Sequence, residues 1–305
     1  MSTINQSYRK VVGSEVRFSL PYDSSCPCGS KVPANKCCLS PSGFFKQPCN
    51  TTPKGKVTGI SREKCYANSL NDCCKKLSGE HYISQNLLHH LNINNSLSVS
   101  GFSWTGTDTK TVPPSALASN ILCERHNNIL SGLDSIALKL FHALDESDLS
   151  DTDDKELLLF SGHDLERWLL KTLCGLIASK SLALTDDVER GIQREWLEIL
   201  YGKSEFSGEA GLYICKTTGH TFSGAHGVEA QAIVKKGKVS GLGLKICGYE
   251  LVFSMTGFPT RVFDSRDFAY RPLELYAIRG KYEKSVVFSW EGAADLGTIT
   301  LNLNK

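Results

Sequence analysis

Cysteine constrains this chain more than any other residue type. Twelve cysteines are present, and nine of them lie within the first 123 residues, mostly in closely spaced groups. The amino-terminal residues lack the apolar core of a secretion signal, and no run approaches the ~18 apolar residues of a membrane span. We therefore expect a cytoplasmic protein with no membrane partner. In that reducing compartment, clustered cysteines bind metal more often than they form disulfides.

The first group of cysteines falls in the short segment 23–40, which reads DSSCPCGSKVPANKCCLS. The candidate ligands are Cys26, Cys28, Cys37 and Cys38. So short a segment cannot bury a hydrophobic core, so a bound metal ion would have to supply its folding energy. Disulfide pairing is the alternative. The segment resembles the SEC-C zinc motif, which also contains CPCGS and ends in Cys-Cys or Cys-His. This resemblance implies one zinc ion and a role in binding a protein partner.

A second group of thiol and imidazole side chains is spread over residues 65–126. Its members are Cys65, Cys73, Cys123 and His126. They form two separated pairs, and two such pairs are what a tetrahedral structural zinc ion requires, because thiolate and imidazole are its preferred donors. Cys74, directly after Cys73, is the alternative ligand.

Polar residues suited to catalysis lie between and directly behind these pairs. His81 follows Glu80 in a stretch that alternates as a strand does, and Asn127 follows His126 at the head of a predicted helix. A neutral imidazole suits the base of a hydrolysis reaction, and carboxylate or amide oxygens suit Mg²⁺. A structural histidine, a surface carboxylate and a helix-capping asparagine are the alternatives for these three positions.

Residues 61–145 resemble the zinc-stapled HNH endonucleases of the His-Me finger (ββα-metal) superfamily. In that family an Asp-His or Glu-His pair lies between two zinc-binding pairs, and an asparagine or histidine follows the second pair. The resemblance implies a treble-clef-like fold in which His81 is the general base. Glu80 and Asn127 would bind a catalytic Mg²⁺ or Mn²⁺ ion, and Asn120 is the candidate for the family's middle asparagine.

The chain departs from this family at three points. Seven residues separate Cys65 from Cys73 where the family has two, Ser84 occupies the usual proline position, and the long interval from His81 to Cys123 implies an insertion. The formal net charge of +2 gives no strong basic field. The implied function is metal-dependent hydrolysis of phosphodiester bonds, in DNA rather than RNA, as in bacterial or phage restriction and defence. A non-catalytic zinc-binding interaction module is the alternative.

An apolar content of 41% predicts an ordinary globular fold, and we expect it to be α+β. Helices are predicted from the apolar spacing of residues 130–144, after a Ser161 cap with Asp164 as its partner, and around residues 188–200. Short β-rich runs separated by turns predict an antiparallel sheet near the C-terminus. The expected parts are a flexible lead-in (1–22), a SEC-C-like zinc motif with a linker (23–60), a zinc-stapled nuclease unit of the ββα-metal type (61–145), a helical segment (146–204) and a β-rich domain (205–305).

Overall fold

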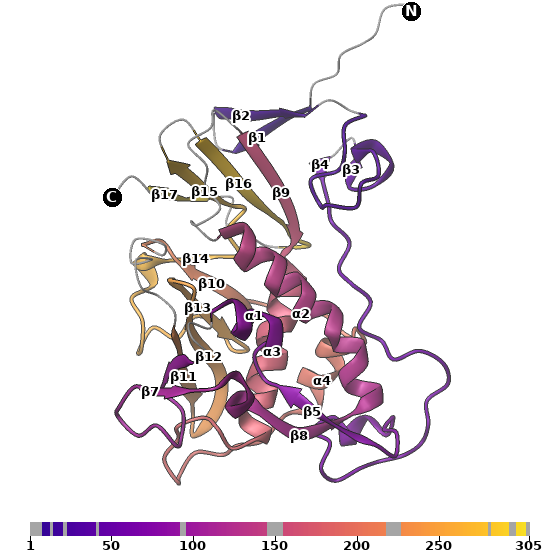
Figure 1. The fold of residues 1–305 in the computed structure, drawn as a ribbon, viewed down its shortest axis with the longest axis vertical. Coiled ribbons are helices and arrows are strands. Elements are labelled where there is room, and N and C mark those ends of the chain that lie inside the picture. The colour runs from indigo at the N-terminus through magenta and orange to yellow at the C-terminus, as the bar shows by residue number, and fades with distance from the viewer. Residues whose placement is uncertain are drawn as a thin grey trace, which may run out of the picture.

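The computed structural model describes residues 8–12, 15–20, 23–40, 43–91, 96–144, 155–217, 227–279, 282–292 and 297–302. These residues form a mixed α+β fold with several sheets, which confirms the expected fold class (Figure 1). Within them the α-helices are α1 (Gln85–His90), α2 (Glu124–Leu144), α3 (Gly162–Ala178) and α4 (Arg194–Leu200).

The larger sheet contains seven strands in the order β14-β10-β13-β12-β11-β6-β7. Its C-terminal strands are β10 (Gly211–Cys215), β11 (Gly227–Lys235), β12 (Lys238–Ile246), β13 (Tyr249–Ser254) and β14 (Phe268–Tyr270). The other two, β6 (Leu97–Ser100) and β7 (Lys110–Val112), come from the interval between His81 and Cys123. Because β6 pairs with β11 and β7 pairs with β6, the insertion expected from the sequence builds one edge of this sheet.

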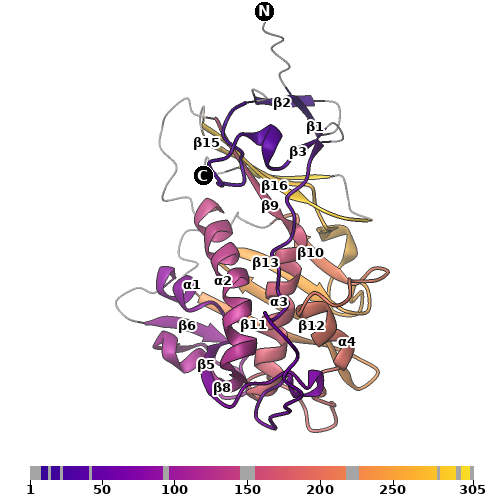
Figure 2. The same ribbon diagram turned by 90° about the vertical axis from the view of Figure 1, so that its right-hand side faces the viewer.

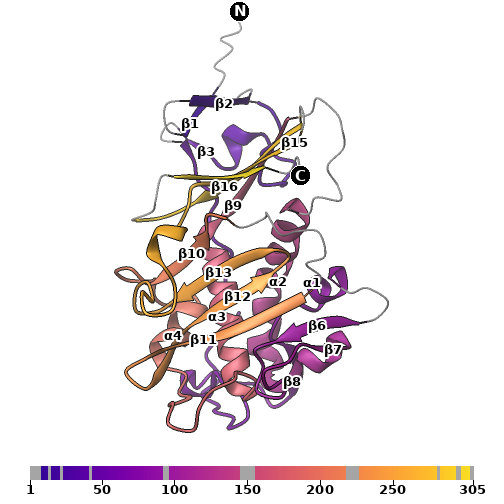
Figure 3. The ribbon, with the colours of Figure 1, turned by 90° about the vertical axis from the view of Figure 1, so that its left-hand side faces the viewer.

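A smaller sheet contains four strands in the order β17-β15-β16-β9 (Figure 3). Their bounds are β9 (Lys155–Ser161), β15 (Glu274–Arg279), β16 (Tyr282–Ser289) and β17 (Thr298–Asn302). Strand β9 runs parallel to β16 and β17 runs parallel to β15, as β6 runs parallel to β11. The expectation of a purely antiparallel sheet is therefore wrong, because crossover connections bring these three strands in beside their partners.

Two-stranded antiparallel sheets make up the rest of the described strands. They are β1 (Tyr8–Val12) with β2 (Glu15–Leu20), β3 (Leu39–Ser40) with β4 (Gly43–Phe44), and β5 (Leu77–His81) with β8 (Ala118–Cys123). The first pair lies in the segment that the sequence suggested was a flexible lead-in, so this segment contains a hairpin. In the last pair, β8 directly precedes α2 in the chain, whereas α1, β6 and β7 lie between β5 and β8.

Helix α3 lies between α2 and the seven-stranded sheet (Figure 2). The predicted N-cap is confirmed, since Ser161 Oγ accepts a hydrogen bond from the backbone N–H of Asp164 at 3.3 Å. The sequence predicted an apolar stripe on one face, but α3 is buried on all sides, including its charged residues Glu166, Arg167 and Lys171. A helix in this position must pair its charges inside the protein, because an unpaired buried charge is strongly destabilising.

The other predicted helices are present with altered ends. Helix α2 buries the residues that the apolar spacing selected, among them Leu130, Leu133 and Leu140. Helix α4 begins at Arg194, several residues later than the pattern suggested. None of the helices in the described part of the chain combines the length and apolar character that crossing a bilayer requires.

Candidate functional site

The thiols of Cys65, Cys73 and Cys123 converge on the imidazole of His126, and all four side chains are buried. Their donor atoms lie within 4.8 Å of one another. Nδ1 of His126 is 3.3 to 3.8 Å from the three sulfur atoms. A tetrahedron with Zn–S bonds of ~2.3 Å and Zn–N bonds of ~2.0 Å has S···N edges of about 3.5 Å. This cluster therefore has the donors and the geometry of a zinc site, and Cys74 is not among its members.

The cluster joins the segment that precedes β5 to helix α2, which follows β8. Cys65 and Cys73 lie on either side of a 3₁₀ turn, Asn68–Leu70, that precedes β5. Cys123 ends β8 opposite Leu77 of β5, and His126 lies in the first turn of α2. A metal ion held by these residues therefore fixes the β5–β8 hairpin against the start of α2.

An ion pair next to the cluster holds the same elements together. The guanidinium of Arg125 in α2 binds both carboxylate oxygens of Asp72 at 2.9 and 3.0 Å. It also donates to the carbonyl oxygens of Lys54 and Lys56, at 2.7 and 3.3 Å. Asp72 in turn accepts a hydrogen bond from the backbone of Thr58. The loop before the hairpin is thereby fastened to the helix independently of the metal.

Burial shifts the pKa of three members of this cluster, Cys65, Cys73 and His126. It raises the pKa of the Cys65 and Cys73 thiols and lowers the pKa of His126 to about 4. The imidazole is therefore in the neutral form that binds metal, whereas the thiols have to release protons when a zinc ion enters.

Another group that could hold a metal ion consists of Cys26, Cys28, Cys37 and Cys38, whose sulfur atoms also lie within 4.8 Å of one another. The sulfur of Cys37 is 3.6 Å from those of Cys28 and Cys38, close to the S···S edge of about 3.8 Å in a Zn–Cys₄ tetrahedron. Although burial alone would raise the pKa of Cys28, hydrogen bonds from Ser30 and Cys26 lower it to about 6. A thiol with this pKa readily supplies the thiolate that zinc requires.

This amino-terminal cluster packs against the chain's own four-stranded sheet. The backbone N–H of Leu159 in β9 donates to the carbonyl oxygen of Pro27 at 3.0 Å. Cys38 and Leu39 pack against Leu159 and Val287 in one apolar cluster. The SEC-C-like segment, from which a protein partner was expected, thus covers the edge strand of a sheet within the same molecule.

Glu80 lies inside the protein, so the alternative of a surface carboxylate is wrong. Its side chain is buried, and its Oε1 is 2.6 Å from Nζ of Lys171. The same ammonium group lies 2.8 Å from a carboxylate oxygen of Asp134 and 3.3 Å from the carbonyl oxygen of His81. A buried ammonium therefore already holds the Glu80 carboxylate, one of the two ligands that the sequence assigned to a catalytic divalent ion, so Glu80 is not free to bind such an ion as it stands.

The other residues expected to act with Glu80 are on the same hairpin and helix. Asn127 donates from Nδ2 to Ser78 Oγ at 3.0 Å, and Ser78 shares a face of β5 with Glu80 because side chains alternate along a strand. His81 ends β5 half-buried, and burial together with the Lys171 charge lowers its pKa, so its imidazole is neutral. Asn120 is exposed on β8, beside Gly79. The hairpin thus brings Glu80 and Asn127 to its α2 side, whereas Asn120 faces outward.

An open cavity of about 430 Å³ adjoins the loop that carries Cys65. Its polar lining includes Lys64, Lys180, Arg190, Glu63 and Asn120. The apolar part of its wall comes from Tyr66, Ile121, Ile177, Ala178 and Ile192. Three cationic groups and one carboxylate give the cavity a net positive lining beside a half-buried aromatic ring.

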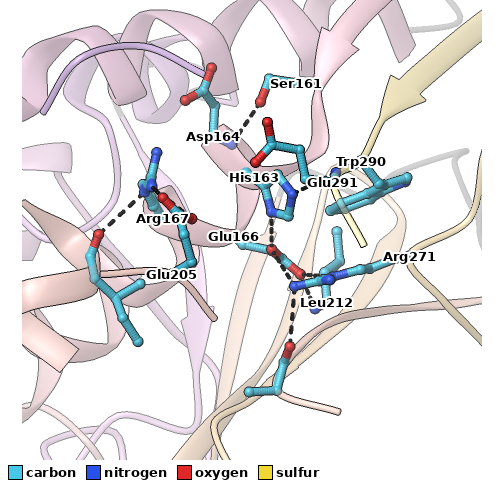
Figure 4. Close-up of polar contacts among 12 residues, drawn as sticks. Ser161, His163, Asp164, Glu166, Arg167, Glu205, Leu212, Arg271, Trp290 and Glu291 are labelled. Atoms are coloured by element: carbon cyan, nitrogen blue, oxygen red, sulfur yellow. Dashed lines mark hydrogen bonds and ion pairs between the residues drawn. The ribbon is translucent and has the colours of Figure 1, made fainter. Parts of the chain in front are cut away.

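A separate buried network joins α3 to the two sheets (Figure 4). The carboxylate of Glu166 lies 2.7 Å from Nε of Arg271 and 2.9 Å from Nδ1 of His163, and it accepts the backbone N–H of Leu212 at 3.0 Å. Nε2 of His163 accepts the backbone N–H of Glu291 at 2.9 Å, so its proton sits on Nδ1. Both ring nitrogens are therefore used in structural bonds, and we assign this network to holding the sheets on α3.

No family model matches this chain, and neither a curated protein nor a solved structure matches it. The site is therefore interpreted from its own residues. Lys171 and Asp134, which surround Glu80 in the structure, were not among the residues predicted for the site. A signal existed for the first, because Lys171 interrupts an apolar stretch of α3, and for the second, because Asp134 lies two helical turns after Asn127 on the same face.

Proposed function

We propose that this chain is a zinc-stapled module that binds single-stranded nucleic acid, with DNA as the preferred strand. The observation that carries the proposal is the cavity beside the zinc-binding loop. Lys64, Lys180 and Arg190 can neutralise phosphates there, and Tyr66 places an aromatic side chain in the same lining. Proteins that hold single strands combine a cationic groove with aromatic surfaces in this way. A local basic lining is sufficient for this even when the net charge of the chain is only +2.

The binding test is a fluorescence anisotropy titration with labelled single-stranded DNA over a series of salt concentrations. Replacing Lys64 and Lys180 together by glutamine should weaken binding and lower the slope of log K against log salt by roughly 1.4, since each lost phosphate contact contributes ~0.7. Lys245→Gln is the matched control, because Lys245 is exposed on β12, outside the cavity lining. Equal affinity in wild type, the Lys64 and Lys180 double variant and Lys245→Gln, or no salt-dependent binding at all, would refute the proposal. RNA and duplex DNA of the same sequence serve as competitors.

Cleavage of the bound strand, in the manner of the HNH endonucleases that residues 61–145 resemble, is the second candidate function. Two observations favour it. The chain has a ligand pair, two paired strands of which the second ends at Cys123, and a helix bearing His126, in the order that the resemblance implies. The neutral imidazole of His81 lies half-exposed at the end of β5, where it can accept a proton from water. We derive no step through a divalent ion, because Lys171 holds the Glu80 carboxylate.

The two candidates are separated by incubating zinc-loaded protein with plasmid and single-stranded DNA in Mg²⁺ or Mn²⁺. If the chain only binds, wild type and His81→Ala should both leave the DNA intact. Cleavage by wild type that is lost in His81→Ala, with zinc content unchanged, would instead establish the nuclease.

A further inference from the structure

The ammonium group of Lys171 occupies a cradle of oxygen atoms between β5 and α2. Lys171 is fully buried in α3, with Nζ 2.6 Å from Glu80 Oε1 and 2.8 and 3.0 Å from the two carboxylate oxygens of Asp134. The carbonyl oxygen of His81 completes the set at 3.3 Å. Oxygens from a strand and a helix therefore converge on one cation that a third element supplies.

Neighbouring side chains fix this cradle in place. Ser84 Oγ donates to Asp134 Oδ1 at 2.6 Å, and the indole Nε1 of Trp168 donates to Ser84 Oγ at 3.0 Å. Because these bonds orient the Asp134 carboxylate without the lysine, the oxygens are preorganised to hold a cation.

The charges in the cradle do not balance, because two carboxylates face one ammonium. Burial alone would lower the pKa of Lys171, but Glu80 and Asp134 outweigh it and raise that pKa, so the ammonium stays charged. Burial raises the pKa of Glu80, the Lys171 charge opposes that rise, and the charge of Asp134 adds to it. The surplus of negative charge means that the oxygens would attract a divalent ion if the lysine were absent.

We infer that Lys171 is a built-in cation that closes a latent divalent-cation site formed by Glu80, Asp134 and the carbonyl oxygen of His81. Nζ lies 2.8 to 3.3 Å from the oxygens of Asp134 and His81 to which it donates hydrogen bonds, and 2.6 Å from Glu80 Oε1 in an ion pair, whereas Mg²⁺ requires ~2.0–2.1 Å and Ca²⁺ about 2.3–2.6 Å. In the native chain the cradle binds no dissociable metal, and removing the ammonium opens it to a hard cation of the size of Ca²⁺. This inference concerns metal binding alone and does not depend on nucleic-acid binding.

Terbium luminescence provides a direct test, because Tb³⁺ occupies calcium-type oxygen sites and Trp168, whose indole N–H reaches the cradle through Ser84, would sensitise its emission. Wild type should give no saturable emission, whereas Lys171→Ala should give a saturable signal that Ca²⁺ displaces. Adding Glu80→Gln to Lys171→Ala removes one carboxylate and should weaken Tb³⁺ binding on the order of tenfold, since affinity follows the number of charged ligands. Unchanged zinc content confirms that each protein is folded.

A second measurement covers the case in which Lys171→Ala folds poorly because two carboxylates lose their partner. The melting temperature of Lys171→Met is then followed with and without Ca²⁺. Ca²⁺ should raise it for the variant but not for wild type, because a ligand that binds only the folded state stabilises that state. Two results would overturn the inference. One is saturable Tb³⁺ binding by wild type that Glu80→Gln abolishes, and the other is a variant that gains neither Tb³⁺ emission nor stabilisation by Ca²⁺.

Discussion

Cys73 and Cys74 are neighbours in the sequence, yet only Cys73 points its sulfur into the cluster with His126. Cys74 instead directs its thiol towards the backbone oxygen of Lys76. Adjacent residues in an extended segment project to opposite sides, so a single position decides which thiol serves as the ligand.

Cys73→Ser should therefore lower the zinc content from two ions to one per chain, whereas Cys74→Ser should keep both. Atomic absorption on purified protein measures this, with the melting temperature recorded in parallel. We expect a marked loss of stability only in Cys73→Ser, since a structural zinc ion contributes folding free energy. Equal zinc content in the two variants would show that either thiol can complete the site.

At Gly211, strand β10 approaches helix α3 closely. A Cβ atom added there would lie 2.2 Å from Oε1 of Glu166, the carboxylate that binds Arg271 and the N–H of Leu212. Only glycine leaves room for this buried ion pair.

Gly211→Ala should lower the free energy of unfolding by about 3 kcal/mol, because it displaces one partner of a buried charge pair and adds backbone strain at a φ of +146°. Gly208→Ala is the control. Its φ is +62° and no atom lies within 4 Å of the added Cβ, so only the backbone cost of about 1 kcal/mol applies. Urea denaturation of both variants measures the difference, and equal losses would contradict the role assigned to Gly211.

The amino-terminal cysteine cluster packs against strand β9, although 116 residues of chain lie between Cys38 and Lys155. An edge strand presents unpaired backbone groups, and the hydrogen bond from Leu159 to Pro27 satisfies one of them. A metal ion that folds the cysteine segment therefore also protects the edge of the four-stranded sheet.

Loss of a metal ion from the Cys26, Cys28, Cys37 and Cys38 cluster should increase the rate of amide hydrogen exchange in β9. In Cys37→Ser, a peptide covering residues 155–161 should exchange faster than in wild type, because the unfolded segment no longer holds the Leu159 amide. Cys49→Ser is the control, since Cys49 lies outside both metal clusters. Unchanged exchange in a Cys37→Ser protein that has lost one zinc ion would show that the cluster only rests on the sheet.

Sequence reasoning succeeded where the determining interactions are local. The Ser161 cap and the apolar spacing of α2 are set by residues a few positions apart, and both are confirmed. The metal clusters could be predicted because the donors of zinc are few and chemically distinctive. The pairing of β9 with β16 could not, since parallel partners far apart in sequence leave no periodic signal between them. The contact of Lys171 with Glu80 is hidden for the same reason, because it depends on how α3 packs against the hairpin.

At the scale of the whole molecule, the two metal clusters lie at opposite ends of the fold. The cysteine segment before β3 lies beside the four-stranded sheet, and the hairpin of β5 and β8 lies at the far end of α2 (Figure 1). The chain between Cys38 and Cys65 is attached to the helices at two points. The backbone N–H of Cys49 donates to Asp164 of α3, and Thr52 Oγ1 donates to the carbonyl oxygen of Tyr201 at the end of α4. The amino-terminal cluster therefore packs on the four-stranded sheet, and the cluster around His126 holds β5 and β8 against α2.

The account depends on the claim that two separate metal ions staple this fold. Anomalous diffraction from crystals of the untreated protein, collected above and below the zinc absorption edge, tests it directly. We expect two peaks per chain, one among Cys26, Cys28, Cys37 and Cys38 and one among Cys65, Cys73, Cys123 and His126. Disulfide bonds within either cluster, or a missing peak at a cluster whose residues are well ordered, would contradict it.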